Sequence, residues 1–357
     1  MKKSDLQTPC LLLDFDLLKY NVEYMAEYLK GKDVALRPHT KCHKTPIISH
    51  LQVRAGAKGI MVAKLGEAEV MAESGIQDIA IGNQIVQESK IRKLVDLNDY
   101  CAISVAVDDL EAVNRLSKIS SEKDTKIRVL VEVDVGDKRC GVQSAKAAVK
   151  LAKMIDKAPG LVFEGIMGWE GMTAFIEDPE ERRKKCNECY KMLIDTRDLI
   201  EKAGLEVETV SAGGTTSFNM AAEYPGMTEI EAGSYVFMDR AHRIKDVPFK
   251  SSLTVLATVT SRPCNDRAVI DAGGKTFSTI GGLPVAIGIT GVEVYRLTDE
   301  HGCIKLDKPS VDLKIGDTVE FIPAYCPPTV NLHDKLYVTE EDEVKFIWNI
   351  EARGRID

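Results

Sequence analysis

Short apolar runs recur at regular intervals along the first two thirds of the chain, and each is followed by a polar or glycine-containing turn. In nearly every case the turn leads into a segment whose apolar residues recur with helical spacing. We interpret the runs as strands at 34–36, 59–63, 79–82, 103–107, 127–133, 161–167, 208–211 and 229–232. Eight strands that alternate with helices are typical of an α/β protein built as a (β/α)8 TIM-type barrel, with a doubly wound open sheet as the alternative.

Beyond about residue 250 the pattern changes to β-rich runs separated by turns, which indicates a second, mostly β domain. The runs are 252–261, 267–271, 285–295, 318–322 and 335–338. We expect an N-terminal strand around residues 11–13 to close this domain. The predicted domains are therefore a barrel over 25–245 and a β domain over 1–24 plus 246–357.

The composition is that of an ordinary globular protein, with a net charge of −8 over 357 residues. This charge argues against nucleic acid or an anionic membrane surface as the partner, and no apolar run approaches the ~20 residues that span a bilayer. The first residues lack the apolar core of a signal peptide, so we expect a cytoplasmic protein whose nine cysteines are free thiols. We expect Cys186 and Cys189, in a highly charged helical segment, on the helix surface.

A barrel gathers its reactive groups on the loops that leave the carboxyl ends of its strands. In this sequence the first of these loops carries His39 and Lys41, the fifth carries Arg139, and the sixth carries Trp169 and Glu170. We therefore expect these ionisable and aromatic side chains at one mouth of the barrel.

The loops after the seventh and eighth strands are typical of an anion site. The first runs from Ser211 through Gly213 and Gly214 to Thr215, and the second begins at Gly233 and Ser234. Glycines let backbone N–H groups turn toward a ligand, and hydroxyls and the start of a helix add to the attraction for negative charge. Barrels commonly hold phosphate at this place. Ordinary glycine turns are the alternative.

A phosphate site combined with a lysine on the first loop points to pyridoxal phosphate, which forms a Schiff base with a lysine amine and withdraws electrons from the substrate Cα. A free lysine amine has a pKa near 10.4, so the site must lower it by burial or by neighbouring positive charge. We favour Lys41 over Lys44, because Lys44 lies further into the helix that we predict from His43 to about Arg54. Arg139, whose charge is permanent, sits where a fixed donor could hold the cofactor's phenolate oxygen; a surface arginine on the loop after the strand is the alternative.

Motifs spread over most of the chain resemble one known family, the D-threonine aldolase and D-serine dehydratase group of pyridoxal-phosphate enzymes, which share the alanine-racemase-type fold (fold type III). The motifs are Thr8-Pro-Cys-Leu-Leu-Leu-Asp14, Arg37-Pro-His-Thr-Lys-Cys-His-Lys44, Ala63-Lys-Leu-Gly-Glu-Ala-Glu69, Val131-Glu-Val-Asp-Val-Gly136 with Arg139-Cys-Gly-Val142, Gly213-Gly-Thr215, Glu231-Ala-Gly-Ser-Tyr-Val-Phe-Met-Asp239, Asp271-Ala-Gly273 and Pro328-Thr-Val-Asn-Leu-His-Asp334.

The resemblance implies roles for individual residues. Lys41 would carry the Schiff base, Arg139 would contact the phenolic oxygen, and Trp169 would lie beside the cofactor ring near Ser211. The phosphate would be held by Gly213, Gly214, Thr215, Gly233, Ser234 and Tyr235. Members of the group are homodimers in which the β domain completes the active site of the partner, and their substrates are small amino acids.

The sequence departs from the metal-dependent members of the group at one place. Those members have a histidine, and an aspartate or cysteine two residues later, just before the Pro-Thr-Val-Asn motif. This chain has Tyr325 and Pro327 at the two positions. A phenol is a poor ligand for a divalent ion at neutral pH and proline offers no side-chain donor, so we expect no metal there.

Three interpretations follow. The first is a lyase that cleaves a D-3-hydroxy amino acid between Cα and Cβ, with His39, Glu170 or Tyr325 as the base for the β-hydroxyl proton. The second is a metal-independent racemase or epimerase, in which Lys41 and Tyr325 act on opposite faces of the substrate. The third is a protein that binds the cofactor without catalysis. We favour the lyase because of the overall resemblance.

Overall fold

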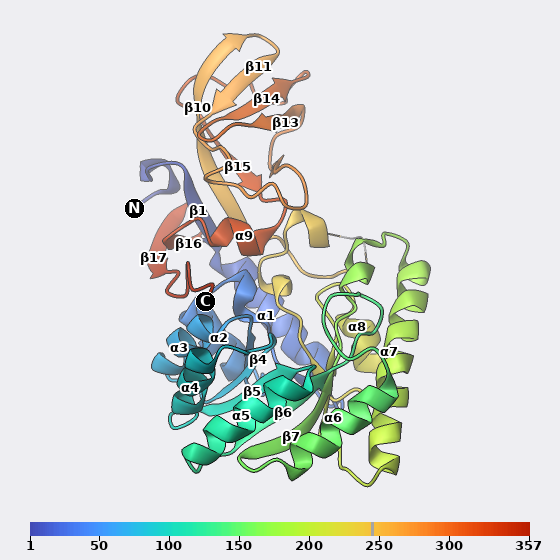
Figure 1. Ribbon diagram of the computed structural model, residues 1–357. Helices are drawn as coiled ribbons and strands as arrows, with labels where there is room; N and C mark the ends of the chain where they lie inside the picture. Colours follow the sequence, from blue (N-terminus) through green and yellow to red (C-terminus); the bar gives the residue numbers. More distant parts are fainter. Residues whose placement is uncertain (244–245) are drawn as a thin grey trace. The chain divides into compact units, whose positions relative to one another are not determined.

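The structure is a computed structural model that describes residues 1–243 and 246–357 (Figure 1). The chain forms two compact units. The barrel unit comprises Met25–Lys41, Ile48–Gly233 and Arg355–Asp357, and the β unit comprises Met1–Tyr24, Cys42–Ile47 and Ser234–Gly354. The domain limits expected from the sequence, 25–245 and 1–24 with 246–357, stay a prediction, because compactness alone does not show which segments fold independently.

The barrel unit is built on an eight-stranded parallel sheet, which confirms the predicted fold class. Its strands are β2 (Ala35–Leu36), β3 (Ile60–Val62), β4 (Asp78–Ile81), β5 (Ala102–Val107), β6 (Ile127–Glu132), β7 (Leu161–Met167), β8 (Thr209–Ala212) and β9 (Glu229–Ile230). They pair in the order β2-β9-β8-β7-β6-β5-β4-β3. A parallel bridge between His39 and Met61 joins the extension of β2 to β3 and so connects the two ends of the sheet.

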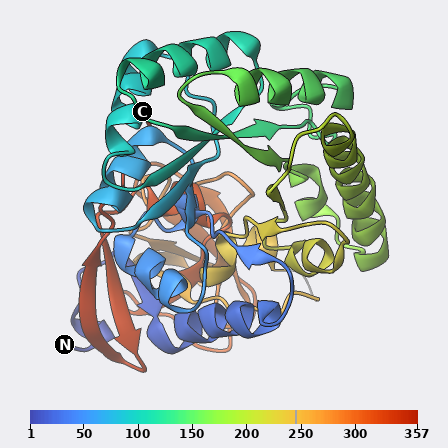
Figure 2. The ribbon, with the colours of Figure 1, turned by 90° about the horizontal axis from the view of Figure 1, so that it is seen from below.

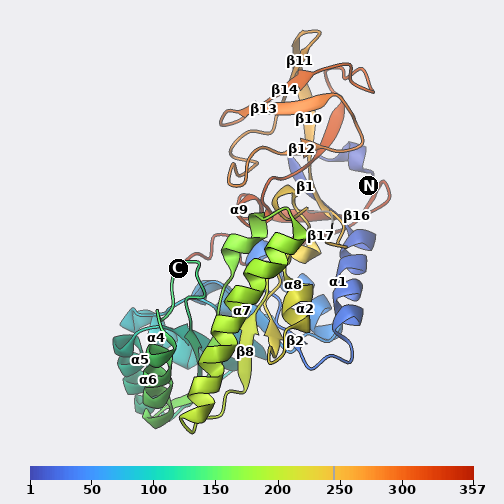
Figure 3. The same ribbon diagram turned by 90° about the vertical axis from the view of Figure 1, so that its right-hand side faces the viewer.

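Helices cover the outer face of this sheet, as Figure 2 shows. Within the barrel unit they are α3 (Leu65–Glu73), α4 (Glu88–Leu97), α5 (Leu110–Glu122), α6 (Ala145–Lys157), α7 (Pro179–Lys202) and α8 (Phe218–Glu223). Two further helices, α1 (Phe15–Leu29) and α2 (Pro46–Arg54), begin in the β unit and end in the barrel unit. Side-chain caps start several of them: Asp109, Ser144 and Asp178 accept backbone N–H groups in the first turns of α5, α6 and α7. Figure 3 shows α7 as a long helix beside α6.

The helix after Lys41 begins later than the sequence pattern predicts. A 3-10 helix, η2 (Thr40–Cys42), carries Lys41, and α2 starts only at Pro46. Proline is favoured at the first position of a helix, and Lys44 has a φ of 52°, in the left-handed region, so the helix cannot extend back through it. Lys44 therefore lies in a turn of the β unit and not in a helix.

Buried side chains fill the inside of the barrel beneath its mouth. Met61, Ala80, Ala106, Leu130 and Met167 form one apolar cluster, with one residue from each of the five strands β3 to β7. This closely packed apolar layer lies below the mouth, holds it rigid and excludes water from beneath it.

The β unit is a nine-stranded sheet. Its strands are β1 (Cys10–Asp14), β10 (Leu253–Cys264), β11 (Arg267–Ile270), β12 (Val285–Ala286), β13 (Val292–Leu297), β14 (Gly302–Leu306), β15 (Thr318–Ile322), β16 (Lys335–Glu340) and β17 (Glu343–Asn349). β1 lies between β10, to which it is antiparallel, and β16, to which it is parallel, as the sequence pattern predicts for the N-terminal strand. The predicted run 285–295 is two strands, because Gly288 and Gly291 both have positive φ between them.

Two predictions about the cysteines have different outcomes. All nine are free thiols. The expectation that Cys186 and Cys189 lie on the surface of α7 is wrong, since both are buried, and burial raises their thiol pKa values to about 11 and about 12. Over residues 1–243 and 246–357, no helix has the length and apolar character needed to cross a membrane.

Candidate active site

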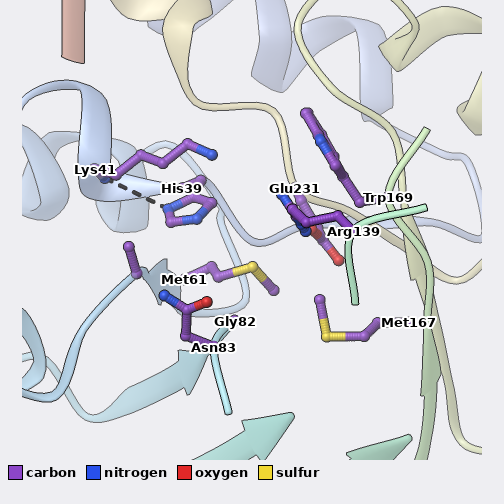
Figure 4. A pocket seen from close by; sticks show the side chains of 10 residues that line it. His39, Lys41, Met61, Gly82, Asn83, Arg139, Met167, Trp169 and Glu231 are labelled. Carbon is purple, nitrogen blue, oxygen red and sulfur yellow. Dashed lines mark hydrogen bonds between the residues drawn. The ribbon is translucent and has the colours of Figure 1, made fainter. Parts of the chain in front are cut away.

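A pocket opens at the carboxyl ends of the barrel strands (Figure 4). Four residues singled out from the sequence line it: His39, Lys41, Arg139 and Trp169. The remaining lining residues are Met61, Ala63, Gly82, Asn83, Met167 and Glu231. The predicted convergence of a lysine, a histidine, an arginine and an aromatic ring at one mouth is therefore present in the barrel unit.

Lys41 is held at the edge of this pocket by the short helix η2. Its backbone N–H donates to Nδ1 of His39 at 3.4 Å, drawn as the dashed line in Figure 4. Nδ1 is therefore the unprotonated nitrogen of a neutral His39, and it is the nitrogen that takes up a proton when His39 gives up this long bond and acts as a base. The amine of Lys41 lies 5.3 Å from the centre of the Trp169 ring, a cation–π distance that orients the amine toward the aromatic side of the pocket.

Arg139 projects into the pocket from the loop after β6. Its guanidinium lies 3.4 Å from Oε1 of Glu132, a buried carboxylate at the end of that strand. Burial raises the pKa of Glu132, while hydrogen bonds from Gln84 and the charge of Arg139 oppose the rise. Half of the Arg139 side chain is exposed, so its guanidinium can contact a bound anion. The ion pair with Glu132 holds the orientation of the guanidinium at the same time.

Glu170 does not line the pocket but organises the loop beneath it. This buried carboxylate accepts hydrogen bonds from Ser217 Oγ at 2.6 Å and from the backbone N–H groups of Gly213 and Gly214 at 3.3 and 3.1 Å. The hydroxyl of Tyr190 donates a fourth bond at 3.1 Å. With all of these donors on one carboxylate, the geometry supports a positioning role for Glu170.

The loop after β8 is the predicted phosphate loop. A Cβ on Gly213 would come 2.7 Å from Ala221, and a Cβ on Gly214 would come 2.9 Å from the ring of Trp169, so only glycine allows the loop to pack this closely. The Oγ1 atom of Thr215 is buried and, among the described residues, has no hydrogen-bond partner. Burying a hydroxyl without a hydrogen-bond partner costs free energy of folding, and a ligand that bonds to the hydroxyl removes this cost.

Ser211, at the end of β8, lies between two buried glutamates of β9 and the residue after it. Its Oγ is 2.9 Å from Oε1 of Glu229 and 2.9 Å from Oε1 of Glu231. Arg37 Nε donates to Glu229 at 2.8 Å. Sequence reasoning did not single out Glu231; the signal was the spacing of two acidic residues on alternate positions of a buried strand, which places both on its inner face.

The remaining predicted residues near the eighth strand lie along the chain that links the two units. A Cβ on Gly233 would come 2.3 Å from the carbonyl oxygen of His39, so glycine is required where the chain passes η2. Ser234 and Tyr235 belong to the β unit, in a buried 3-10 turn, and the Tyr235 ring packs against Phe249 at 5.3 Å between ring centres.

Tyr325 lies within the β unit in a cluster with Asp239, His242 and Cys326. Asp239 accepts from the His242 ring at 2.7 Å and from the Cys326 backbone N–H at 2.7 Å, and the His242 ring stacks on Tyr325 at 5.7 Å. Burial, the Asp239 carboxylate and the thiols of Cys42 and Cys326 raise the pKa of Tyr325 to about 12. The phenol is therefore protonated at neutral pH.

Comparison with known proteins shows the family. Residues 13–241 match the model of the alanine racemase N-terminal domain, and residues 252–339 match that of the putative serine dehydratase domain. A D-threonine aldolase of Arthrobacter is 36% identical over 97% of this chain and 93% of its own length, and a 3-hydroxy-D-aspartate aldolase of Paracoccus denitrificans is 35% identical over 99% and 94%. The crystal structure of D-threonine aldolase from Filomicrobium marinum superposes with a TM-score of 0.96 at 35% identity, covering 100% and 98% of the two chains.

An eight-stranded α/β barrel with a lysine at its mouth and a mostly β second unit defines the alanine-racemase-type fold. The chain belongs to the alanine racemase N-terminal domain family, and its relatives at about 35% identity are aldolases. The family resemblance inferred from the motifs is thus confirmed.

Proposed function

We propose that this protein is a pyridoxal-phosphate-dependent lyase that cleaves D-3-hydroxy amino acids to glycine and an aldehyde. The observation that carries the proposal is the pocket at the barrel mouth, which brings Lys41, His39, Arg139 and Trp169 together in a chain that matches aldolases over almost its whole length. The family is one of pyridoxal-phosphate enzymes, and its aldolase members supply the reaction class.

The residues of the barrel unit fit this cofactor. Thr215 offers a buried hydroxyl that lacks a partner among the described residues, and Gly213 and Gly214 leave room beside it that a Cβ would fill. Lys41 supplies the amine for attachment and Arg139 a permanent cation for the phenolate oxygen. Glu170 already uses the N–H groups of both glycines, so we assign it to holding the loop in shape for the phosphate.

When bound, the cofactor supplies an aldehyde that bonds to the amine and a ring that accepts the electron pair released at the substrate Cα. The protein must then take the proton from the β-hydroxyl as the Cα–Cβ bond breaks. Of the three bases considered, His39 is the one that lines the pocket. Glu170 is committed to four hydrogen bonds, and Tyr325 is protonated at neutral pH, so we propose His39 as the base.

We propose that no metal is needed at the position where metal-dependent relatives place their ligands. The donor set there is a phenol with a raised pKa, a buried thiol whose pKa is raised well above its usual value, and a proline. A phenol is a poor ligand for a divalent ion at neutral pH, proline has no side-chain donor, and a single thiol does not by itself make a metal site. We also propose a cytoplasmic homodimer, in which the β unit completes the site of the partner; the nine free thiols suit a reducing compartment.

Product analysis tests the reaction. Purified protein loaded with pyridoxal phosphate is incubated with D-threonine, D-3-hydroxyaspartate and their L-enantiomers, with and without EDTA. We expect glycine with acetaldehyde or glyoxylate from the D-substrates only, at rates that EDTA leaves unchanged. Loss of optical purity without cleavage would favour the racemase, no turnover of any kind would favour the non-catalytic protein, and sensitivity to EDTA would contradict the metal-free proposal.

Replacing the proposed base should slow the chemical step. We expect His39→Asn to lower kcat by about 10²–10⁴-fold, the usual contribution of a general base, while cofactor attachment to Lys41 persists. The measurement is steady-state cleavage of D-threonine together with the absorbance of the bound cofactor. His301→Asn, at an exposed histidine of the β unit, is the matched control and should be silent. A full rate in His39→Asn would assign the base elsewhere.

Tyr325→Phe separates the lyase from the racemase. The substitution keeps the ring that stacks on His242 and removes only the hydroxyl. Because the phenol cannot act as a base at neutral pH, we expect the cleavage rate to stay within the same order of magnitude. A racemase that uses Tyr325 on one face would instead lose exchange of the Cα proton with solvent deuterium, which NMR of the recovered substrate measures.

A further inference from the structure

The contacts around Ser211 require one of two buried glutamates to carry a proton. A serine hydroxyl has a single hydrogen and can donate to one acceptor in good geometry. Its oxygen lies 2.9 Å from a carboxyl oxygen of Glu229 and 2.9 Å from one of Glu231. If both were carboxylates, one of these buried contacts would bring two lone pairs together. One carboxyl must therefore be neutral and donate to Ser211.

The surroundings decide which of the two it is. Glu229 pairs with the buried guanidinium of Arg37 at 2.8 Å and is the ionised member. Glu231 has no ion pair with any described residue, and only 4% of it is exposed. Burial, reinforced by the negative charges of Glu229, Glu170 and Glu132, raises the pKa of Glu231 to about 8, although the bond to Ser211 opposes the rise. Glu231 is thus the neutral acid.

Glu231 also lines the pocket, as Figure 4 shows, so its carboxyl group borders the place where a ligand binds. The proposed function assigns the cofactor's aldehyde to Lys41, its phenolate oxygen to Arg139 and its phosphate to the Thr215 loop. The ring nitrogen is the polar atom of the cofactor that this assignment leaves without a partner. A ring nitrogen that carries a proton withdraws electrons more strongly than one that does not.

We propose that Glu231 is a neutral carboxylic acid in the cofactor-free protein and passes its proton to the ring nitrogen of the bound cofactor. In this step the carboxyl exchanges its bond to Ser211 for one to the ring nitrogen, while Ser211 donates its hydrogen to Glu229. The O–H bond of Glu231 breaks and an N–H bond forms, which leaves a carboxylate beside a positively charged ring. This inference rests on the proposed cofactor, and it makes Glu231 a catalytic residue because the carboxyl touches the ring. The charged and titratable groups around it are Glu229, Glu170, Glu132, Arg139, His39 and Lys41.

The first measurement needs no cofactor. Infrared spectra of the cofactor-free protein at pH 7 should contain the carbonyl stretch of an un-ionised carboxyl, and that band should vanish in Glu231→Gln. Glu208→Gln removes an exposed glutamate of the barrel unit and should leave the band unchanged. A spectrum without this band in the wild type, or with the band intact in Glu231→Gln, would overturn the assignment even if the cofactor does not bind.

The second measurement follows the ring nitrogen itself. Protein reconstituted with cofactor labelled with ¹⁵N in the ring should give the chemical shift of a protonated nitrogen in the wild type and that of an unprotonated nitrogen in Glu231→Gln. Borohydride reduction and peptide mapping confirm attachment to Lys41 in both samples, so a failure to bind the cofactor is distinguished from a failure of the proton transfer. An unprotonated nitrogen in the wild type overturns the proposal, and this reading does not require the variant to fold.

Discussion

Lys41→Ala is expected to abolish both the covalent attachment of the cofactor and the cleavage reaction. The amine at this position lies at the edge of the pocket, and its loss removes the nucleophile that bonds to the cofactor aldehyde. An alanine side chain supplies no substitute, so the loss of kcat should reach the limit of detection while the barrel stays folded. The measurement is borohydride reduction followed by peptide mapping, together with the rate of glycine release.

Lys44→Asn is the matched control for that experiment. Lys44 is the other lysine of the same motif, and its φ of 52° lies in the left-handed region that asparagine tolerates better than alanine. The control should keep the covalent label and turn over substrate. A label that persists in Lys41→Ala and disappears in Lys44→Asn would reverse the assignment of the two lysines and contradict the site proposed here.

The barrel and the position of its pocket could be predicted because both depend on local pattern. Each strand of the barrel is an apolar run with a turn after it, and in a parallel barrel the residues after every strand meet at one mouth. Lys41, Arg139 and Trp169 are therefore found together although they lie far apart in the sequence. Topology alone brings them to the same place.

Contacts between particular side chains could not be predicted in the same way. Glu170 is one of the three bases that the sequence offers, but only the structure shows that its carboxylate accepts the N–H groups of Gly213 and Gly214, more than 40 residues later. The protonation of Glu231 depends on Ser211 of β8 and, through Glu229, on Arg37, which follows β2. Such roles depend on which face of a strand is buried and on which charges meet inside, and sequence spacing sets neither.

Strands with atypical exposure were also missed. β17 carries Val344, Phe346 and Ile347, yet most of it is exposed because it lies at the edge of the sheet, paired along its length with β16 and bridged to Lys2 only at its first residue in the part of the chain that the structure describes. β14 is five residues long. Its buried positions alternate with Cys303, which is partly buried, and Lys305, which is exposed. A short or exposed strand buries too little apolar surface to leave a clear period of two in the sequence.

Removing the buried charge of Arg37 is expected to destabilise the barrel strongly. Arg37 is almost fully buried and pairs with Glu229 and Asp78 at 2.8 Å each. Arg37→Leu leaves Glu229 buried without its nearest cation, and breaking a buried pair from one side costs about 3–5 kcal/mol. Urea unfolding followed by circular dichroism measures this cost. Arg92→Leu, at an exposed pair with Glu88, should cost no more than about 1 kcal/mol.

The pH dependence gives an independent check on the same network. Burial pushes the pKa of Asp78 up, but hydrogen bonds and charge from Arg128 and Arg37 outweigh it and leave the pKa below its usual value. A carboxyl with a lowered folded pKa contributes stability above its unfolded pKa, and this contribution is lost as the pH falls through the folded pKa. Arg37→Leu weakens the lowering, so its stability should fall less steeply than that of the wild type as the pH is lowered from 6 toward the acid range. The prediction is wrong if the unfolding free energy of Arg37→Leu stays within about 1 kcal/mol of the wild type at pH 7 and falls just as steeply in acid. That result would mean that Arg128 alone neutralises this cluster.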